Sequence, residues 1–364
     1  MKIRRGILVL DLIALLVTIA FSAAHATTEI LPVERYAYVP NLHDGTVSIF
    51  EVNASGKLHA LDTILTGRAP RHLASAGQVV YVIDVWDNTL TAFTIDATTG
   101  HLTISGAPLS TGLSPEAVTV DPLGRYVYVA NGDSHDVSAY RVENTRGGLV
   151  EIGRYATGNY PTAIAIDPCG QFLYVTNYSS DTVTAYTINP VNGALKTLGI
   201  VKTGNNPAAA AIDPSGRFLY VADGIGSTLS TYRIEPSSGV LSPIARIPAP
   251  VYPYATIIDP SGRYIYTANF GSDDVTTYVI KPETGVPTKI GTAPAGIGAF
   301  SIAMDTSGQY VYVANVRSSS LSVYTIHPKH GTLVPLETVP GQSGSAAIIL
   351  NNLNGEATRY NCKQ

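Results

Sequence analysis

Asp121-Pro-Leu-Gly-Arg-Tyr-Val-Tyr-Val-Ala-Asn131 returns along the chain with an almost constant spacing. The other clear copies start 46 residues apart, at Asp167, Asp213, Asp259 and Asp305. Two weaker copies end at Asn41 and Asp84, which brings the number of copies to seven. A period in the forties combined with strand-like segments is the sequence signature of a propeller blade.

One copy, residues 160–203, shows how a blade is built. Pro161–Ile166 alternates small and branched residues, as a short strand does. Asp167-Pro-Cys-Gly170 is a turn, because Pro restricts φ, Asp can accept backbone hydrogen bonds and Gly closes the turn. We predict four antiparallel strands per copy, here over residues 161–166, 171–176, 182–188 and 194–202. The predicted fold class is all-β, a seven-bladed β-propeller.

Two series of aromatic residues recur in register with the repeat. The predicted second strands carry Tyr38, Tyr81, Tyr128, Tyr174, Tyr220, Tyr266 and Tyr312. The predicted third strands carry Phe50, Phe93, Tyr140, Tyr186, Tyr232, Tyr278 and Tyr324. Rings on neighbouring strands bury a large apolar area. We therefore predict that all fourteen belong to the core between blades and do not stack on a ligand.

The two ends of the repeat region predict how the ring closes. The first copy begins with a second strand, Tyr36–Pro40, and lacks a first strand before it. Ser345–Leu350, near the C-terminus, matches the first strands of the other copies. We expect these segments to pair, so that residues 27–364 form one domain with its repeats over about 35–351. A closed ring leaves no interior sheet edge unpaired.

The N-terminus predicts export. Lys2, Arg4 and Arg5 precede an apolar stretch, and Ala24-His25-Ala26 is a small-x-small cleavage site. We interpret residues 1–26 as a signal peptide that leaves a mature chain beginning at Thr27 in the periplasm or outside the cell. An anchor that is not cleaved stays open as the alternative, and Asp11 within the apolar stretch weakens both interpretations, because a carboxylate in an apolar region is costly.

Composition excludes some classes of partner and cofactor. A net charge of −4 with 23 Lys and Arg argues against nucleic-acid binding, which needs a basic surface. No Cys-x-x-Cys-His motif is present, so covalent c-type haem is excluded. We expect no cofactor, no membrane span in the mature chain, no metal site and a monomer. Pairing of Cys169 with Cys362, and a weak metal alternative at acidic loops such as Asp273 with Asp274, stay open.

The repeat resembles a known family. Tyr174-Val-Thr-Asn177 is the YVTN motif itself, and the pattern Asp-Pro-x-Gly-Arg-Tyr-x-Tyr-Val-x-Asn is similar to that of the YVTN-repeat and lactonase-type seven-bladed propellers. That group includes 6-phosphogluconolactonase and the carboxymuconate-lactonizing enzymes. The resemblance covers residues 35–351. It implies the propeller fold and, as an activity, the hydrolysis of a lactone.

Candidate site residues lie where the copies differ. The residue after the proline of each first strand, or its equivalent, changes at every copy, as Ala346, Arg71, Glu116, Thr162, Ala208, Tyr254 and Phe300. Equivalent positions in a closed ring must converge around its axis, and function on a propeller usually lies at such a mouth. We predict that Arg71, His72, Glu116, Tyr254 and Phe300 line one cavity there.

Roles for these residues follow partly from the resemblance. Pro70-Arg71-His72 is similar to the Pro-Arg-His segment of the lactonase family, whose arginine lies in the active cleft with an acidic residue nearby. The family has a Glu four residues after a second-strand Tyr, where this chain has Val85, and Glu116 is the nearby replacement. We predict His72 and Glu116 as catalytic residues, and Arg71, Tyr254 and Phe300 as ligand-binding residues.

Two functions remain open from the sequence. One is a lactonase-like hydrolase that binds a small anionic lactone or sugar-type ligand at the mouth. The other is a non-catalytic propeller that binds an envelope protein or a glycan through the same face. The Glu that is missing from the family pattern, together with export, favours the second function, whereas the family resemblance favours the first.

Overall fold

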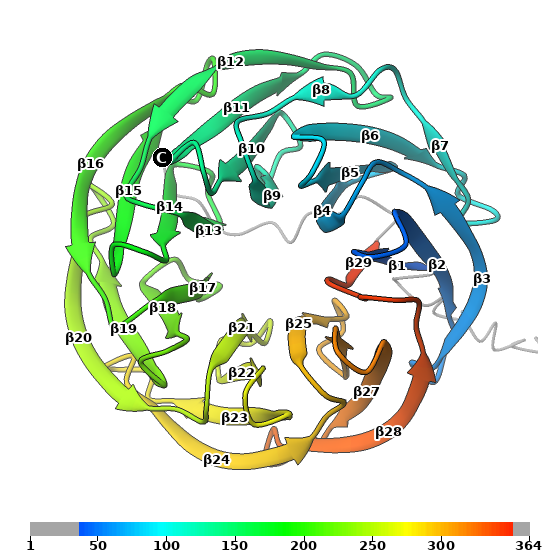
Figure 1. Cartoon of the computed structure of the whole chain (residues 1–364). Helices are drawn as coiled ribbons and strands as arrows, with labels where there is room; N and C mark the ends of the chain where they lie inside the picture. The colour runs from blue at the N-terminus through cyan, green and yellow to red at the C-terminus, as the bar shows by residue number, and fades with distance from the viewer. Residues whose placement is uncertain (1–35, 352–364) are drawn as a thin grey trace, which may run out of the picture. The chain divides into compact units, whose positions relative to one another are not determined.

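The structure, a computed structural model, describes residues 36–351 as seven antiparallel sheets around a common axis (Figure 1). Six sheets have four strands and one has five. The predicted all-β, seven-bladed propeller is therefore confirmed. The predicted signal peptide over residues 1–26, the start at Thr27, and Cys362 lie outside the described residues.

The strands of each blade follow one another from the axis outward. Blade 1 contains β29 (Ile349–Asn351), β1 (Tyr36–Asn41), β2 (Thr46–Val52) and β3 (Leu58–Leu65). Blade 2 contains β4 (Pro70–Ala76), β5 (Val79–Asp84), β6 (Thr89–Ile95), β7 (Leu102–Ile104) and β8 (Leu109–Ser110). Blade 3 contains β9 (Pro115–Val120), β10 (Tyr126–Asn131), β11 (Asp136–Val142) and β12 (Leu149–Ala156). Blade 4 contains β13 (Pro161–Ile166), β14 (Phe172–Asn177), β15 (Thr182–Ile188) and β16 (Leu195–Lys202).

The last three blades have the same order. Blade 5 contains β17 (Pro207–Ile212), β18 (Phe218–Asp223), β19 (Thr228–Ile234) and β20 (Leu241–Pro248). Blade 6 contains β21 (Pro253–Ile258), β22 (Tyr264–Asn269), β23 (Asp274–Ile280) and β24 (Pro287–Pro294). Blade 7 contains β25 (Ala299–Met304), β26 (Tyr310–Asn315), β27 (Ser320–Ile326) and β28 (Leu333–Pro340). In blade 4 the strands predicted from sequence lie within one residue of those observed.

Blade 2 departs from the pattern in its outermost strand. Gly106 has a left-handed backbone and Pro108 has no amide hydrogen to donate, so the strand is interrupted between Ile104 and Leu109. Both of its parts, β7 and β8, still pair with β6.

The ring closes where the two ends of the propeller meet. Tyr36, Ala37 and Tyr38 of β1 pair with Asn351, Leu350 and Ile349 of β29. Ser345 forms an isolated bridge to Asn41, and the Ala346 amide donates to the Pro40 carbonyl at 2.9 Å. The segment Ser345–Leu350 therefore supplies the missing inner strand of blade 1, as predicted.

Aromatic rings fill the wedges between blades. All fourteen predicted positions are buried, each with at most 2% of its surface exposed. In six of the seven blades the second-strand tyrosine also ties its blade to the next: Tyr174 donates its hydroxyl to the Gly239 carbonyl at 2.8 Å, and Tyr220 donates to Gly285 at the same distance. A buried phenol needs such a partner, so each ring both fills space and sets the spacing of the blades.

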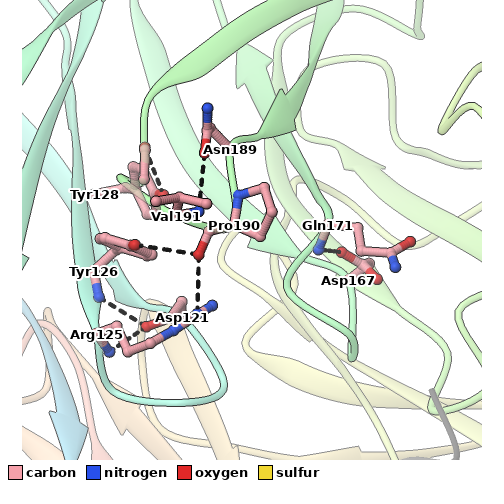
Figure 2. A network of polar contacts seen from close by, with 10 residues as sticks. Asp121, Arg125, Tyr126, Tyr128, Asp167, Gln171, Asn189, Pro190 and Val191 are labelled. Atoms are coloured by element: carbon pink, nitrogen blue, oxygen red, sulfur yellow. Dashed lines mark hydrogen bonds and ion pairs between the residues drawn. The ribbon is translucent and has the colours of Figure 1, made fainter. Parts of the chain in front are cut away.

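The Asp-Pro-x-Gly turns lie at the opposite end of the blades from the mouth. Asp167 accepts from the amides of Gln171 and Phe172, both at 2.6 Å, and Asp121 likewise holds the amide of Tyr126 at 2.8 Å. Figure 2 shows the junction of blades 3 and 4, where Arg125 also reaches the carbonyl of Pro190 at 3.1 Å. These aspartates organise turns and blade junctions, as the sequence predicts.

One junction lacks its aromatic filler. In six blades an aromatic residue near the start of the second strand packs over a turn glycine of the next blade, as Tyr126 does over Gly193. Blade 2 has Val79 at this place, over Gly147. An open cavity of about 950 Å³, lined in part by Val79, Tyr81 and Asn144, includes this junction and extends to Met304 of blade 7 and Leu350 of blade 1. The shorter side chain explains why the wedge is less completely filled here.

Removing the closing segment tests ring closure. We expect deletion of residues 345–364 to lower the free energy of unfolding by at least about 3 kcal/mol, because Ala346, Ala347 and Ile348 are buried and β1 would lose its partner strand. Urea unfolding measures this. The control is deletion of residues 352–364 alone, which keeps β29; equal stability of the two truncated chains would contradict the closure.

A second test concerns the turn glycines. Gly216 has φ +71 with the nearest side-chain atom 3.6 Å from an added Cβ, so Gly216→Ala adds backbone strain without a collision. We expect a loss of about 1–2 kcal/mol. Gly199, in β16, has open space and no left-handed φ, so Gly199→Ala is the matched control and should be neutral or slightly stabilising. Similar melting temperatures for the two variants would refute the assignment of strain.

Candidate functional site

Two sets of loops build one face of the ring, which we call the mouth face. One set leads into the innermost strands, and the other connects the second and third strands. Every loop of both sets contains a residue with positive φ, and eleven of these residues are not glycine. The left-handed residues of the turns on the opposite face are all glycines. Non-glycine residues are thus held in an unfavourable backbone conformation only at the mouth face of the described chain.

Side chains in the loops between second and third strands accept hydrogen bonds from amides in the loops that lead into the innermost strands of the next blade. Asp181 accepts from the amide of Asn206 at 2.7 Å, and Asp273 accepts from that of Gly298 at 2.7 Å. Asn88, His135, Ser227 and Ser319 make the equivalent bond. Short polar side chains tolerate the left-handed conformation, and these use it to fix the next loop. The mouth face is therefore rigidly positioned by the scaffold.

Tyr160 and Tyr252 are exceptions among these residues. Both have left-handed φ, 53° and 56°, a conformation that costs a residue with a Cβ about 1–2 kcal/mol. Each precedes the proline of an innermost strand, and each turns its ring toward the mouth. Tyr160 donates to Glu116 at 2.9 Å, and Tyr252 shares a 2.6 Å hydrogen bond with Tyr178. Ala69, Ser114 and Asn206 share this backbone conformation at the equivalent positions, so what distinguishes Tyr160 and Tyr252 is the aromatic ring and hydroxyl that the loop carries to the mouth.

Arg71 crosses the mouth of the ring. It is on β4 of blade 2, yet its Nη2 donates to the hydroxyl of Tyr254 on β21 of blade 6 at 3.0 Å. Figure 1 shows β4 and β21 on opposite sides of the central opening. Its Nε forms an ion pair with Glu116, whose side chain is only 4% exposed, while that of Arg71 is 22% exposed. These side chains close the axis at this level instead of lining a wide channel.

Aromatic rings support this ion pair. Tyr254 and Phe300 stack with centroids 4.1 Å apart, and the Arg71 guanidinium lies 5.3 Å from the Phe300 ring. Phe270 packs against both rings, with centroids 6.0 and 6.1 Å away. Thr162, Ala208 and Ala346, the remaining mouth-position residues, are small, so the large side chains at these positions come from blades 2, 3, 6 and 7.

The local electrostatics keep the phenols protonated. Burial and then the charge of Glu116 raise the pKa of Tyr160 to about 12, so its hydroxyl remains a donor to that carboxylate. Burial raises the pKa of Tyr254 as well, although the charge of Arg71 opposes this. Burial favours the neutral form of Arg71, but Tyr254 and Glu116 outweigh it and raise the pKa of Arg71.

His72 lies next to this cluster but makes a different contact. Its Nδ1 accepts from the amide of Val118, on the innermost strand of the next blade, at 3.4 Å. Burial, followed by the charge of Arg71, lowers the pKa of His72 to about 4. The ring is therefore neutral at pH 7, with its proton on Nε2.

The structure brings Arg71, Glu116, Tyr254 and Phe300 into direct contact, and it places His72 beside them on the same strand as Arg71. Sequence reasoning missed Tyr160, Tyr178, Tyr252 and Phe270. Two signals were available. Tyr160 and Tyr252 directly precede the prolines of innermost strands, and Tyr178 and Phe270 are the aromatic residues that follow strand-end asparagines.

The acidic loops have structural partners. Asp274 accepts from Asn269 at 2.6 Å, and Asp136 accepts from Asn131 at 2.6 Å. Within residues 36–351, no three His, Cys, Asp or Glu side chains are grouped so that they could hold a metal ion. Cys169 does not carry a free thiol. No helix in this part of the chain is long and apolar enough to span a membrane.

Comparison with known proteins points to one family. The sequence pattern of the family described as "Lactonase, 7-bladed beta-propeller" matches residues 19–166, 153–256 and 251–349. The 6-phosphogluconolactonase of Erwinia tasmaniensis is 28% identical over 133 residues, and that of an Enterobacter species is 27% identical over 135. Each match spans 34% of this chain and only 40% of the relative.

Solved structures share the fold over much more of the chain. A Bacteroides fragilis structure superposes with a TM-score of 0.80 at 20% identity, covering 90% of this chain and 99% of that one. The periplasmic gluconolactonase of Pseudomonas aeruginosa superposes with a TM-score of 0.76 at 18% identity, covering 86% of this chain and 98% of that one. At such identities the likeness establishes the propeller fold alone.

The pH dependence of stability tests the environment of His72. Between pH 6.5 and 4 the unfolded His72 binds a proton that the folded one does not, so we expect stability to fall as the pH is lowered through this window. The contribution is up to about 3 kcal/mol at 1.36 kcal/mol per pKa unit. Urea unfolding from pH 7.5 to 4 measures it.

His72→Ser is the matched control for that experiment. Ser301 occupies the equivalent place in blade 7 and accepts from the amide of Ile348 at 3.4 Å, so serine can replace the acceptor without titrating. The variant should lose less stability on acidification than the unmodified chain. Identical pH profiles would show that His72 is not held neutral.

Proposed function

Because the chain belongs to the family of seven-bladed β-propeller lactonases, we propose that it hydrolyses a small lactone at its mouth face. The observation that carries the proposal is the ion pair between Arg71 and Glu116, which is held at the axis by Tyr254 and Tyr160. It supplies hydrogen-bond donors and a carboxylate within one partly buried cluster, and ester hydrolysis needs both kinds of group.

Each residue of the cluster has a role in the proposed reaction. Arg71 and Tyr254 donate toward the lactone carbonyl oxygen, which gains negative charge when water attacks the carbonyl carbon. Glu116 takes a proton from that water. The bond between the carbonyl carbon and the ring oxygen then breaks, Glu116 returns the proton to the ring oxygen, and the product is a hydroxy acid. Phe300 and Tyr254 provide an apolar surface for the ring.

We assign the role of base to Glu116 and not to His72. The Nδ1 lone pair of His72 already accepts from the amide of Val118, and its Nε2 carries the ring proton, so His72 has no lone pair left to take a proton from water. Its protonated Nε2 suits it to donate a hydrogen bond to a substrate oxygen. The proposed mechanism thus uses both residues that the sequence predicts to be catalytic, with Glu116 as the base and His72 as a hydrogen-bond donor.

Substrate class and location are part of the proposal. The partial matches to 6-phosphogluconolactonases support an anionic sugar lactone as substrate. The fold shared with a periplasmic gluconolactonase, together with the signal-like residues 1–26, supports action in the periplasm or outside the cell.

Two observations favour a second candidate function, a non-catalytic binding propeller. The Glu of the family pattern is Val85 here, and the charge of Arg71 is already neutralised by Glu116. In that case the mouth face would bind an envelope protein or a glycan without turning it over.

Turnover of a panel of five- and six-membered lactones by the purified protein tests the proposal. We expect Glu116→Gln to reduce kcat by about 100-fold or more, because the carboxylate that accepts the proton is lost. Thr162→Ala, at another mouth position, is the control and should keep near-normal turnover, and thermal melting checks that both variants fold. No turnover by the unmodified protein would favour the binding propeller, and full activity of Glu116→Gln would remove Glu116 from the mechanism.

A further inference from the structure

Arg317 is a second arginine on the aromatic cluster of the mouth face. It lies in the loop between β26 and β27 of blade 7, and its guanidinium stands 4.2 Å from the centroid of Phe270. Its amide donates to the carbonyl of Ile297 at 3.2 Å, which fixes the backbone beneath the side chain. Phe270 packs on Tyr254 and Phe300, so Arg317 and Arg71 flank the same group of rings.

The charges of the mouth-face arginines are balanced differently. Arg71 is paired with Glu116, and Arg68 is paired with Asp87 at 2.6 Å. Arg317, by contrast, forms neither an ion pair nor a side-chain hydrogen bond with any residue from 36 to 351. It is also exposed to solvent. Among these three, Arg317 is the cation whose donors remain available to a ligand.

The neighbouring backbone makes room for this side chain. Gly298 lies in the loop that leads into β25, and a Cβ there would come within 2.9 Å of the Arg317 Cγ. Five other blades carry a non-glycine residue at the equivalent left-handed position, such as Ala69 in blade 2. Glycine is thus not needed here for the backbone alone. Its absence of a side chain leaves room for the Arg317 stem, which passes close to this loop while the guanidinium lies over Phe270.

We propose that Arg317 is the residue that recognises the acid group of the substrate, a carboxylate or a phosphate, while Arg71 and Glu116 serve the reacting carbonyl. This rests on the proposed function, because it assigns a specificity role within the same site. The guanidinium contacts the Phe270 ring, and its N–H donors have no partner among residues 36–351, so they are available for a two-pronged contact with an oxyanion. Stacking also holds the group in place before binding, which reduces the entropy lost when the ligand binds.

The test compares three lactones that differ at one carbon: a neutral aldonolactone, the same lactone with a 6-phosphate, and the aldarolactone with a carboxylate there. KM and kcat are measured, and Kd is measured by calorimetry at pH 6. We expect the unmodified protein to bind at least one charged lactone about 10- to 100-fold more tightly than the neutral one, the range for a charged hydrogen bond. The preferred charged lactone identifies the acid group as phosphate or carboxylate.

Three variants assign this preference to Arg317. Arg317→Met keeps the stem packed on Phe270 but removes the donors, and should abolish the preference without changing binding of the neutral lactone. Gly298→Ala should weaken the preference by displacing Arg317, and Ala69 indicates that alanine is tolerated at this backbone position. Arg68→Met is the matched control that removes a paired arginine from the same face, and should leave the preference intact.

The outcomes separate this inference from the proposed function. The inference would be overturned if the unmodified protein showed no preference for a charged lactone. It would also be overturned if Arg317→Met lowered the affinity for all three lactones equally. Binding that prefers the charged lactones and depends on Arg317, without any turnover, would sustain the role of Arg317 and refute the lactonase activity. Turnover that does not depend on Arg317 would support the lactonase activity and refute the role of Arg317 in recognising the acid group.

Discussion

The buried tyrosine of each second strand is the contact on which the ring depends. Its ring fills the wedge between two blades, and in six blades its hydroxyl donates to the carbonyl of a turn glycine in the next blade, as Tyr128 does to Gly193 at 2.9 Å. The same glycine lies under another aromatic residue of the preceding blade, here Tyr126, where any Cβ would collide. One side chain and one glycine therefore set both the spacing and the angle of a junction, and seven similar junctions close a circle.

Because the repeated groups hold the blades together, the mouth face is free to carry residues that do not repeat. The scaffold nevertheless controls it closely, since loop side chains such as Asp181 and Asp273 bind the amides of the neighbouring loops. The strained conformations of Tyr160 and Tyr252 persist because these hydrogen bonds and the adjoining prolines leave the backbone little alternative. Stability is thus provided mainly by the wedges and the turns on the opposite face, and part of it offsets strain at the mouth.

Much of the architecture was predictable from particular residues. The spacing of the Asp-Pro-x-Gly turns, the aromatic series in the second and third strands, and the match of Ser345–Leu350 to the other innermost strands together predicted the blades and their closure, which the structure confirms. The convergence of Arg71, Glu116, Tyr254 and Phe300 could also be anticipated, because equivalent positions of a closed ring face one axis. The interrupted outer strand of blade 2 was missed, although Gly106 and Pro108 mark it in the sequence.

The sequence by itself determined what repeats, because a periodic pattern of turn residues and aromatic rings has only one way to bury all its copies equally. Only the tertiary structure decided which of the non-repeating side chains meet. Arg71 bonds to Tyr254, 183 residues away and across the ring, while Arg317 is left without an acidic partner in the described chain. Such pairings depend on how far each side chain reaches across the axis and on what its neighbours leave open, and spacing along the chain contains neither quantity.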